Sequence, residues 1–142
     1  MSQEDVELAR TDLESFLAGT HESAREDMLS GQTERWDPEI ELDASESPVL
    51  DLGGVYRGRD TVQRFWREWL AAWETIRFEY ELVDAGNCVV MLLDLRMRGR
   101  STGIDVPFGK VAWVFTYRSG LLIHMKLYMD QSEALNAVGL QE

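Results

Sequence analysis

The 142-residue sequence predicts a single α+β domain in which a curved antiparallel sheet wraps around N-terminal helices. Before Glu74, most apolar residues recur at helical spacing, whereas from Ile76 onward the period falls to two, which is typical of strands. Runs of helix followed by runs of strand favour helices packed on a face of an antiparallel sheet. Because no repeat or linker interrupts the chain, we expect one domain over residues 1–142.

The first half of the chain predicts two helices and a short strand. A first helix over residues 2–18 has one apolar face, formed by Val6, Ala9, Leu13, Phe16 and Leu17. A weaker helix is expected over about residues 22–30, closed by a glycine. Within residues 35–45, two apolar residues alternate with carboxylates and predict a short strand.

A third helix is expected after a glycine turn at residues 53–54. Asp60 and Gln63 stand in the capping-box relation and predict where this helix begins. Its apolar positions fall on one stripe, comprising Val62, Phe65, Trp66, Trp69, Leu70 and Trp73. Three tryptophans therefore face the interior from a single helix.

The second half predicts an antiparallel meander and a terminal helix. Four strands are expected, over residues 76–83, 88–98, 106–117 and 121–129, separated by short turns. A short helix over residues 132–138 follows, with Gly139 at its C-terminal end.

The composition narrows the possible partners. A net charge of −12 repels phosphate backbones, so we expect no nucleic-acid partner. No apolar run approaches the roughly 20 residues that span a bilayer, and the acidic start of the chain is unlike a signal peptide, so we expect a cytoplasmic protein without membrane contact. Cys88 is the sole cysteine, and His21 and His124 stand far apart, so we expect neither a metal site nor a cofactor.

A curved sheet around a tryptophan-rich helix encloses a cone that large aromatic side chains either fill or line. In the first case the tryptophans are simply core. In the second they surround a ligand cavity, and the candidate ligand-binding residues are Trp66, Trp69, Trp73, Phe108, Trp113 and Tyr56. The sequence leaves both interpretations open.

Several segments carry a resemblance to a known family. These are "VYRGRDTVQRFW" (55–66), "ELVDAGNCVVMLL" (81–93), "GRSTGIDV" (99–106) and the ending "YRSGLLIHMKLYMDQSEALNAVGL" (117–140). In order and spacing the chain resembles the SnoaL-like branch of the nuclear transport factor 2-like superfamily. The resemblance implies a conical α+β fold with a deep cavity and a homodimer formed through the outer face of the sheet. It leaves the chemistry open, because the superfamily contains polyketide cyclases, ketosteroid isomerases, dehydratases, epoxide hydrolases and non-catalytic binding modules.

The first catalytic candidate is Asp43. Its position is similar to that of the aspartate that moves protons in the ketosteroid isomerases of this superfamily. A carboxylate inside an apolar cone would have a raised pKa and could transfer protons near neutral pH. The surrounding segment is rich in carboxylates, however, and such residues are usually solvated.

The last strand carries a polar column formed by His124, Lys126, Tyr128 and Asp130. If this face points into the cone, it brings an acid, a base and hydrogen-bond donors together. If it points outward, it is a solvent-exposed surface or a dimer interface. The resemblance to SnoaL-like cyclases suggests an aspartate–histidine pair, here Asp130 with His124. Six residues of extended strand separate them by about 20 Å, however, so they cannot form a directly hydrogen-bonded pair.

Two functions remain. We expect a module that binds a small hydrophobic molecule in an apolar cavity, because the catalytic set is incomplete. The alternative is a cofactor-independent enzyme of the polyketide cyclase, isomerase or hydrolase type that uses a carboxylate inside the cavity. They differ in one feature: an enzyme needs at least two titratable groups within reach of one ligand atom.

Overall fold

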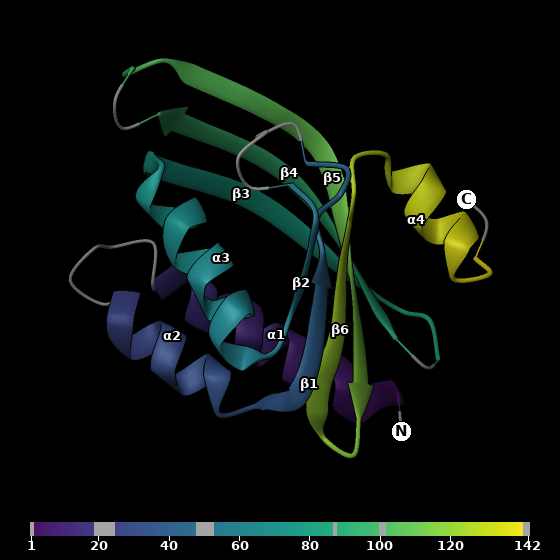
Figure 1. Ribbon diagram of the computed structural model, residues 1–142. Helices are drawn as coiled ribbons and strands as arrows, with labels where there is room; N and C mark the ends of the chain where they lie inside the picture. The colour runs from purple at the N-terminus through teal and green to yellow at the C-terminus, as the bar shows by residue number, and fades with distance from the viewer. Residues whose placement is uncertain (1, 19–24, 48–52, 87, 100–101, 141–142) are drawn as a thin grey trace.

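The structure is a computed structural model that describes residues 2–18, 25–47, 53–86, 88–99 and 102–140. Within these ranges, four helices and six strands follow one another, and Figure 1 shows their arrangement. They are α1 (Ser2–Ala18), α2 (Arg25–Thr33), β1 (Trp36–Asp43), β2 (Val55–Arg57), α3 (Arg59–Ala71), β3 (Trp73–Asp84), β4 (Val89–Gly99), β5 (Asp105–Arg118), β6 (Leu121–Tyr128) and α4 (Gln131–Ala137).

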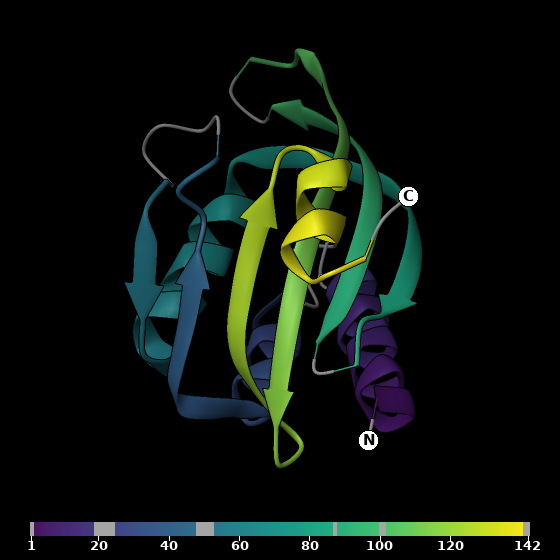
Figure 2. The same cartoon turned by 90° about the vertical axis from the view of Figure 1, so that its right-hand side faces the viewer.

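The six strands form one curved sheet in the order β2-β1-β6-β5-β4-β3. The meander from β3 to β6 is antiparallel, as predicted, while β1 pairs in parallel with β6. Helices α1, α2 and α3 lie in the hollow of the sheet, and α4 lies on its outer face (Figures 1 and 2). The predicted class, an α+β fold with a curved sheet around N-terminal helices, is confirmed.

The hydrophobic core lies between the three helices and the inner face of the sheet. Helix α3 buries Val62, Phe65, Trp66 and Leu70 there, on the face that its apolar spacing predicts. A second, smaller cluster lies on the outer face, where α4 places Ala134 against β4 and β5. Cys88 belongs to this outer cluster and is buried.

The ends of α3 differ from the prediction. The N-cap residue is Gly58, which makes no side-chain cap, so the predicted capping box at Asp60 is wrong. Gln63 instead donates from Nε2 to the hydroxyl of Thr33, 2.8 Å away, and joins α3 to α2. The helix ends at Ala71, and Trp73 begins strand β3 rather than continuing the helical stripe. Periodicity failed here because a tryptophan at i+4 suits both the helix face and the start of an inward-facing strand.

A break in the register of β6 changes which side chains face inward. Thr116 of β5 pairs with His124, but Tyr117 pairs with Leu122, so Ile123 is an extra residue in the ladder. Strict alternation predicts that Leu122 shares the face of His124. With the irregularity, Leu122 and Met125 both face the interior, and His124 faces outward.

Candidate functional site

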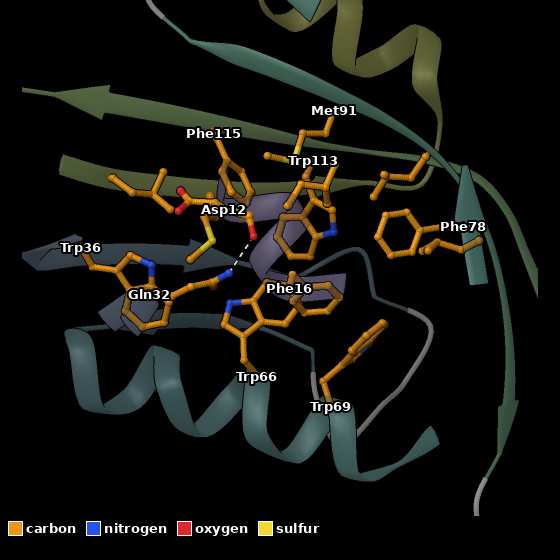
Figure 3. Close-up of a pocket in the computed structure, with 15 residues that line it drawn as sticks. Asp12, Phe16, Gln32, Trp36, Trp66, Trp69, Phe78, Met91, Trp113 and Phe115 are labelled. Atoms are coloured by element: carbon orange, nitrogen blue, oxygen red, sulfur yellow. Dashed lines mark hydrogen bonds between the residues drawn. The ribbon is translucent and has the colours of Figure 1, made fainter. Parts of the chain in front are cut away.

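An aromatic cavity lies between α1, α3 and the inner face of the sheet (Figure 3). Its volume is about 50 Å³, compared with the roughly 10–15 Å³ that a single water needs and the 300–1,000 Å³ of pockets for drug-sized ligands. Of the fifteen described residues that line it, thirteen are apolar or aromatic, namely Leu13, Phe16, Trp36, Trp66, Trp69, Phe78, Met91, Leu93, Leu95, Trp113, Phe115, Leu122 and Met125. The cavity therefore suits a compact, largely apolar molecule.

The aromatic rings of the wall are packed against one another, which fixes their orientation. Trp66 is at the centre: its ring centroid lies 5.3 Å from those of Phe16 and Trp113 and 5.8 Å from that of Trp69. The pairs with Phe16 and Trp69 are edge-to-face, the arrangement that aromatic quadrupoles prefer. A planar ring entering the cavity would meet both faces and edges of these side chains.

The two remaining lining residues, Asp12 and Gln32, make one end of the cavity polar. Asp12 is buried, and its carboxylate accepts hydrogen bonds from Arg35 Nε at Oδ1 and from the Tyr117 hydroxyl at Oδ2, at 2.9 and 2.8 Å. Arg35 Nη2 also lies 2.9 Å from Oδ1. Gln32 donates from Nε2 to the backbone carbonyl of Asp12, at 2.8 Å. This network ties α1, the end of α2 and strand β5 together.

The surroundings of Asp12 act on its ionisation in both directions. Burial raises the pKa of Asp12, and the hydrogen bond from Tyr117 together with the charge and hydrogen bond of Arg35 oppose this rise without cancelling it. Burial and the neighbouring Asp12 carboxylate also raise the pKa of the Tyr117 hydroxyl, so Tyr117 stays protonated and donates. Asp12 is thus a carboxylate held by Arg35 and Tyr117 at the edge of an apolar space.

The two ends of the cavity differ in accessibility. Phe16, Trp69 and Phe78 are half-buried, whereas every other lining side chain is buried. Figure 3 shows Trp69 and Phe78 on the side opposite Trp36 and Gln32. A ligand that enters between the half-buried rings would therefore bring its leading end toward Asp12.

The predicted ligand-binding residues fall into three groups. Trp66, Trp69 and Trp113 line the cavity. Trp73 is buried beside Trp69, with ring centroids 6.2 Å apart, and is not a lining residue. Tyr56 packs on Phe65, at 5.0 Å between centroids, and its hydroxyl donates to the carbonyl of Gly53. The side chain of Phe108, within β5, lies outside the described part of the structure.

The predicted catalytic residues lie outside the cavity. Asp43 faces the outer side of β1, where its carboxylate accepts from the hydroxyl of Ser45 at 2.6 Å and lies 3.5 Å from Lys126 Nζ. Burial acts to raise the pKa of Asp43, but the Ser45 hydrogen bonds and the Lys126 charge outweigh it, and the pKa lies below its ordinary value. His124 Nε2 lies 3.5 Å from a carboxylate oxygen of Glu41 on the same face.

The polar column of the last strand thus faces outward. Its residues His124, Lys126 and Tyr128 line a separate cleft of about 330 Å³ between the outer face of the sheet and α4. Lys126 Nζ sits 5.2 Å from the ring centroid of Tyr128. Asp130 caps α4 by accepting from the backbone N–H groups of Ser132 and Glu133. Their catalytic roles stay predictions, and the structure does not bring these side chains to the aromatic cavity.

Sequence reasoning missed the polar end of the cavity. Asp12 lies three residues after Ala9 and four before Phe16, so it interrupts the apolar face of α1. A carboxylate at a core-facing position is the signal that was available. Gln32, Arg35 and Tyr117 offered no comparable signal, because only the fold brings α2 and β5 to α1.

The described residues form neither a metal centre nor a membrane-spanning helix. No group of three histidine, cysteine, aspartate or glutamate side chains among them is arranged to hold a metal ion. Within the same ranges, every helix is too short or too polar to cross a membrane.

Comparisons with known proteins identify the family and support the fold. The SnoaL-like domain family matches residues 8–125, and no curated protein matches the chain. Among solved structures, the chain is similar to an NTF2-like protein from Burkholderia xenovorans LB400 (21% identity, 90% of each chain, TM-score 0.68) and to one of unknown function from Burkholderia pseudomallei K96243 (20% identity, 90% of this chain and 97% of the other, TM-score 0.62).

A third similar structure, from Catenulispora acidiphila DSM 44928, is a protein with a ketosteroid isomerase-like fold in complex with trimethylamine (14% identity, 76% of this chain and 79% of the other, TM-score 0.57). At these identities the solved structures establish the fold and leave the ligand of this chain open.

Proposed function

The chain belongs to the SnoaL-like domain family, and from this premise we propose that it binds a small, largely apolar molecule in its aromatic cavity. The observation that carries the proposal is the cavity wall, where rings fixed by their neighbours surround an apolar space closed by two polar side chains. Mostly apolar pockets with a few convergent polar groups are the usual form of small-molecule sites.

The size of the cavity restricts the ligand to a small molecule of one ring at most. A volume of about 50 Å³ is far below that of pockets for drug-sized molecules. Because an engineered cavity that binds benzene measures about 150 Å³, even a single ring requires Phe16 or Trp69 to move, and both are half-buried. The fully buried lining residues on β4, such as Met91 and Leu93, are fixed by the core.

The five tryptophans provide an internal test. Trp36, Trp66, Trp69 and Trp113 line the cavity and Trp73 does not. Titration with toluene, a neutral single-ring probe, should shift the indole N–H signals of the four lining tryptophans in a ¹H–¹⁵N spectrum more than that of Trp73. For so small a ligand we expect a dissociation constant of about 1 mM or below.

Two neighbouring residues on β4 supply a matched control. Leu93 lines the cavity, whereas Leu92 belongs to the outer cluster under α4. Leu93→Phe should fill the cavity and abolish the toluene shifts, and Leu92→Phe should leave them unchanged. Equal shifts in both variants, or none in the wild-type protein, would show that the cavity is packed core rather than a binding site.

A second candidate function rests on Asp12. It is a carboxylate inside the cavity, with a raised pKa and a hydroxyl partner in Tyr117, as a cofactor-independent isomerase or cyclase requires. In this role Asp12 would take a proton from a carbon next to a carbonyl, leave an enolate, and return a proton to it.

Hydrogen–deuterium exchange tests this second candidate without a known substrate. The methyl protons of acetophenone should exchange in D₂O faster with the protein than in buffer, as followed by NMR. Asp12→Asn should remove the acceleration, and Asp43→Asn, which alters a carboxylate on the outer face, should keep it. If the methyl protons exchanged with the wild-type protein no faster than in buffer, the proposed proton transfer by Asp12 would be contradicted, and the binding function would be unaffected.

A further inference from the structure

The polar end of the cavity offers an unused hydrogen-bond acceptor. A carboxylate has about four acceptor positions, two on each oxygen. On Asp12, the guanidinium of Arg35 occupies Oδ1, and the hydroxyl of Tyr117 donates to Oδ2. Oδ2 therefore retains one acceptor position beyond its bond to Tyr117, and Asp12 lines the cavity.

The second polar lining residue, Gln32, also presents a hydrogen-bond acceptor. Gln32 uses Nε2 to donate to the backbone carbonyl of Asp12, and its remaining side-chain heteroatom, Oε1, accepts. The indole N–H groups of the lining tryptophans are donors only. The lining thus combines acceptors at its polar end with donors on its aromatic wall, and a hydroxyl group can satisfy both because it donates and accepts.

Charge restricts the ligand further. The guanidinium of Arg35 already neutralises Asp12 at 2.9 Å, so the site has no spare negative charge to hold a cation. An anionic ligand would lose its hydration beside a carboxylate, which is costly in an apolar space. The ligand group that fits the free acceptor position of Asp12 is therefore a neutral hydrogen-bond donor.

We propose that the cavity selects a neutral hydroxyl-bearing ring compound, a phenol or a cyclic alcohol, whose hydroxyl donates to Oδ2 of Asp12 while its ring packs against the contacting pair Trp66 and Trp113. This inference rests on the proposed binding function and names the class of ligand. The ring enters past Phe16 and Trp69, and the hydroxyl leads toward Asp12.

The test compares phenol with toluene, anisole and benzoate on the wild-type protein, using the indole N–H signals described above. Phenol and toluene are close in size, anisole accepts without donating, and benzoate carries a charge. A hydrogen bond to a carboxylate predicts that phenol binds about tenfold or more tighter than anisole. Benzoate should bind more weakly than phenol by at least as much.

Asp12→Asn gives the second arm of the test. The substituted amide keeps the shape of the side chain, but it replaces one of the two acceptor oxygens with an NH₂ donor and removes the negative charge, so the preference for phenol over anisole should disappear. Asp43→Asn changes a carboxylate on the outer face and should leave that preference intact. Should Asp12→Asn fail to fold, the wild-type comparison still decides.

The outcomes separate the two proposals. Binding of toluene and phenol with no preference over anisole, or a preference for benzoate, would overturn the hydroxyl-selective inference and leave small-molecule binding standing. Failure of all four compounds to shift the lining tryptophans would overturn both.

Discussion

At the scale of single residues, Asp12 and Asp43 show how their surroundings decide what a carboxylate does. Asp12 is buried beneath the aromatic wall and held by Arg35 and Tyr117. Asp43 lies on the outer face within reach of Ser45 and Lys126. Their pKa values shift in opposite directions, upward for Asp12 and downward for Asp43.

Removal of the Asp12 carboxylate should be among the more destabilising changes in α1. Asp12→Ala leaves Arg35 and the Tyr117 hydroxyl without their partner. Loss of one member of a buried ion pair costs about 3–5 kcal/mol, and because the side chain of Arg35 is 37% exposed we expect the lower end, about 3 kcal/mol in urea unfolding. The control is Glu7→Ala on the same helix, at an exposed site, which should change stability by less than about 0.5 kcal/mol. If Asp12→Ala and Glu7→Ala lowered the free energy of unfolding equally, the stabilising role of the Asp12–Arg35–Tyr117 network would be contradicted.

The two carboxylates should also give opposite pH dependence. A raised folded pKa means that the contribution of Asp12 to stability falls as pH rises from 3.8 through that pKa and is constant above it. A lowered folded pKa means that the contribution of Asp43 is present above 3.8 and is lost as pH falls through that pKa.

Urea unfolding of the wild-type protein, Asp12→Asn and Asp43→Asn at several pH values measures both effects. The stability of the wild-type protein relative to Asp12→Asn should decline from acid toward neutral pH. Relative to Asp43→Asn it should increase over the acidic range, by no more than about 1 kcal/mol because the pair with Lys126 is solvent-exposed in part. If both stability differences changed with pH in the same direction, the opposite pKa shifts of Asp12 and Asp43 would be refuted.

At the scale of elements, α3 depends on the backbone of the residue before it. Gly58 is its N-cap and has φ of 90°, in a region that side chains disfavour. The residue turns the chain from β2 into the helix that carries Trp66 and Trp69. Arg59 at the start of the helix donates from Nε to the carbonyl of Trp36, at 2.9 Å, and so positions another residue of the cavity wall.

A pair of glycine substitutions tests this backbone requirement. An added Cβ meets no atom within 4 Å at either Gly58 or Gly31, and only Gly58 has a positive φ. Gly58→Ala should therefore cost about 1–2 kcal/mol through backbone strain alone. Gly31→Ala, inside α2, should stabilise by about 0.4–1 kcal/mol. Thermal unfolding measures both, and a neutral Gly58→Ala would show that the turn tolerates a side chain.

The sequence predicted the elements well where periodicity was long and regular. Helix α1, the antiparallel meander and the inward tryptophans of α3 follow from spacing alone. Strand β2 was not predicted, because three residues cannot show alternation. The irregularity at Ile123 also escaped, because it depends on pairing with β5.

The site was predictable only in part, for a physical reason. Trp66, Trp69 and Trp113 line the cavity because each lies on the inward face of a regular element. The polar end brings together residues far apart in sequence, with Tyr117 lying 105 residues after Asp12. Such a contact depends on the path of the whole chain, so the spacing of residues within one helix or strand cannot predict it.

At the scale of the whole molecule, the two faces of the sheet serve different purposes. The inner face and helices enclose the aromatic cavity, and the outer face carries ion pairs and the cleft beside α4. The family resemblance implies a homodimer through that outer face. Thr116, opposite His124 in the sheet, is half-buried at this cleft.

Thr116→Arg therefore tests the expected dimer. A long cation on the outer face blocks close contact between two sheets, so in sedimentation experiments we expect a dimer for the wild-type protein and a monomer for Thr116→Arg. The indole spectrum and toluene binding should stay unchanged, because Thr116 faces away from the cavity. A wild-type protein that sediments as a monomer would show that this chain does not share the expected assembly.

The most direct test of hydroxyl-selective binding in the aromatic cavity is a crystal structure of the protein grown with phenol. We expect the phenol ring against Trp66 and Trp113, with its oxygen within hydrogen-bonding distance of Asp12 Oδ2. A phenol bound only in the outer cleft, or a cavity closed by its own aromatic side chains, would contradict it.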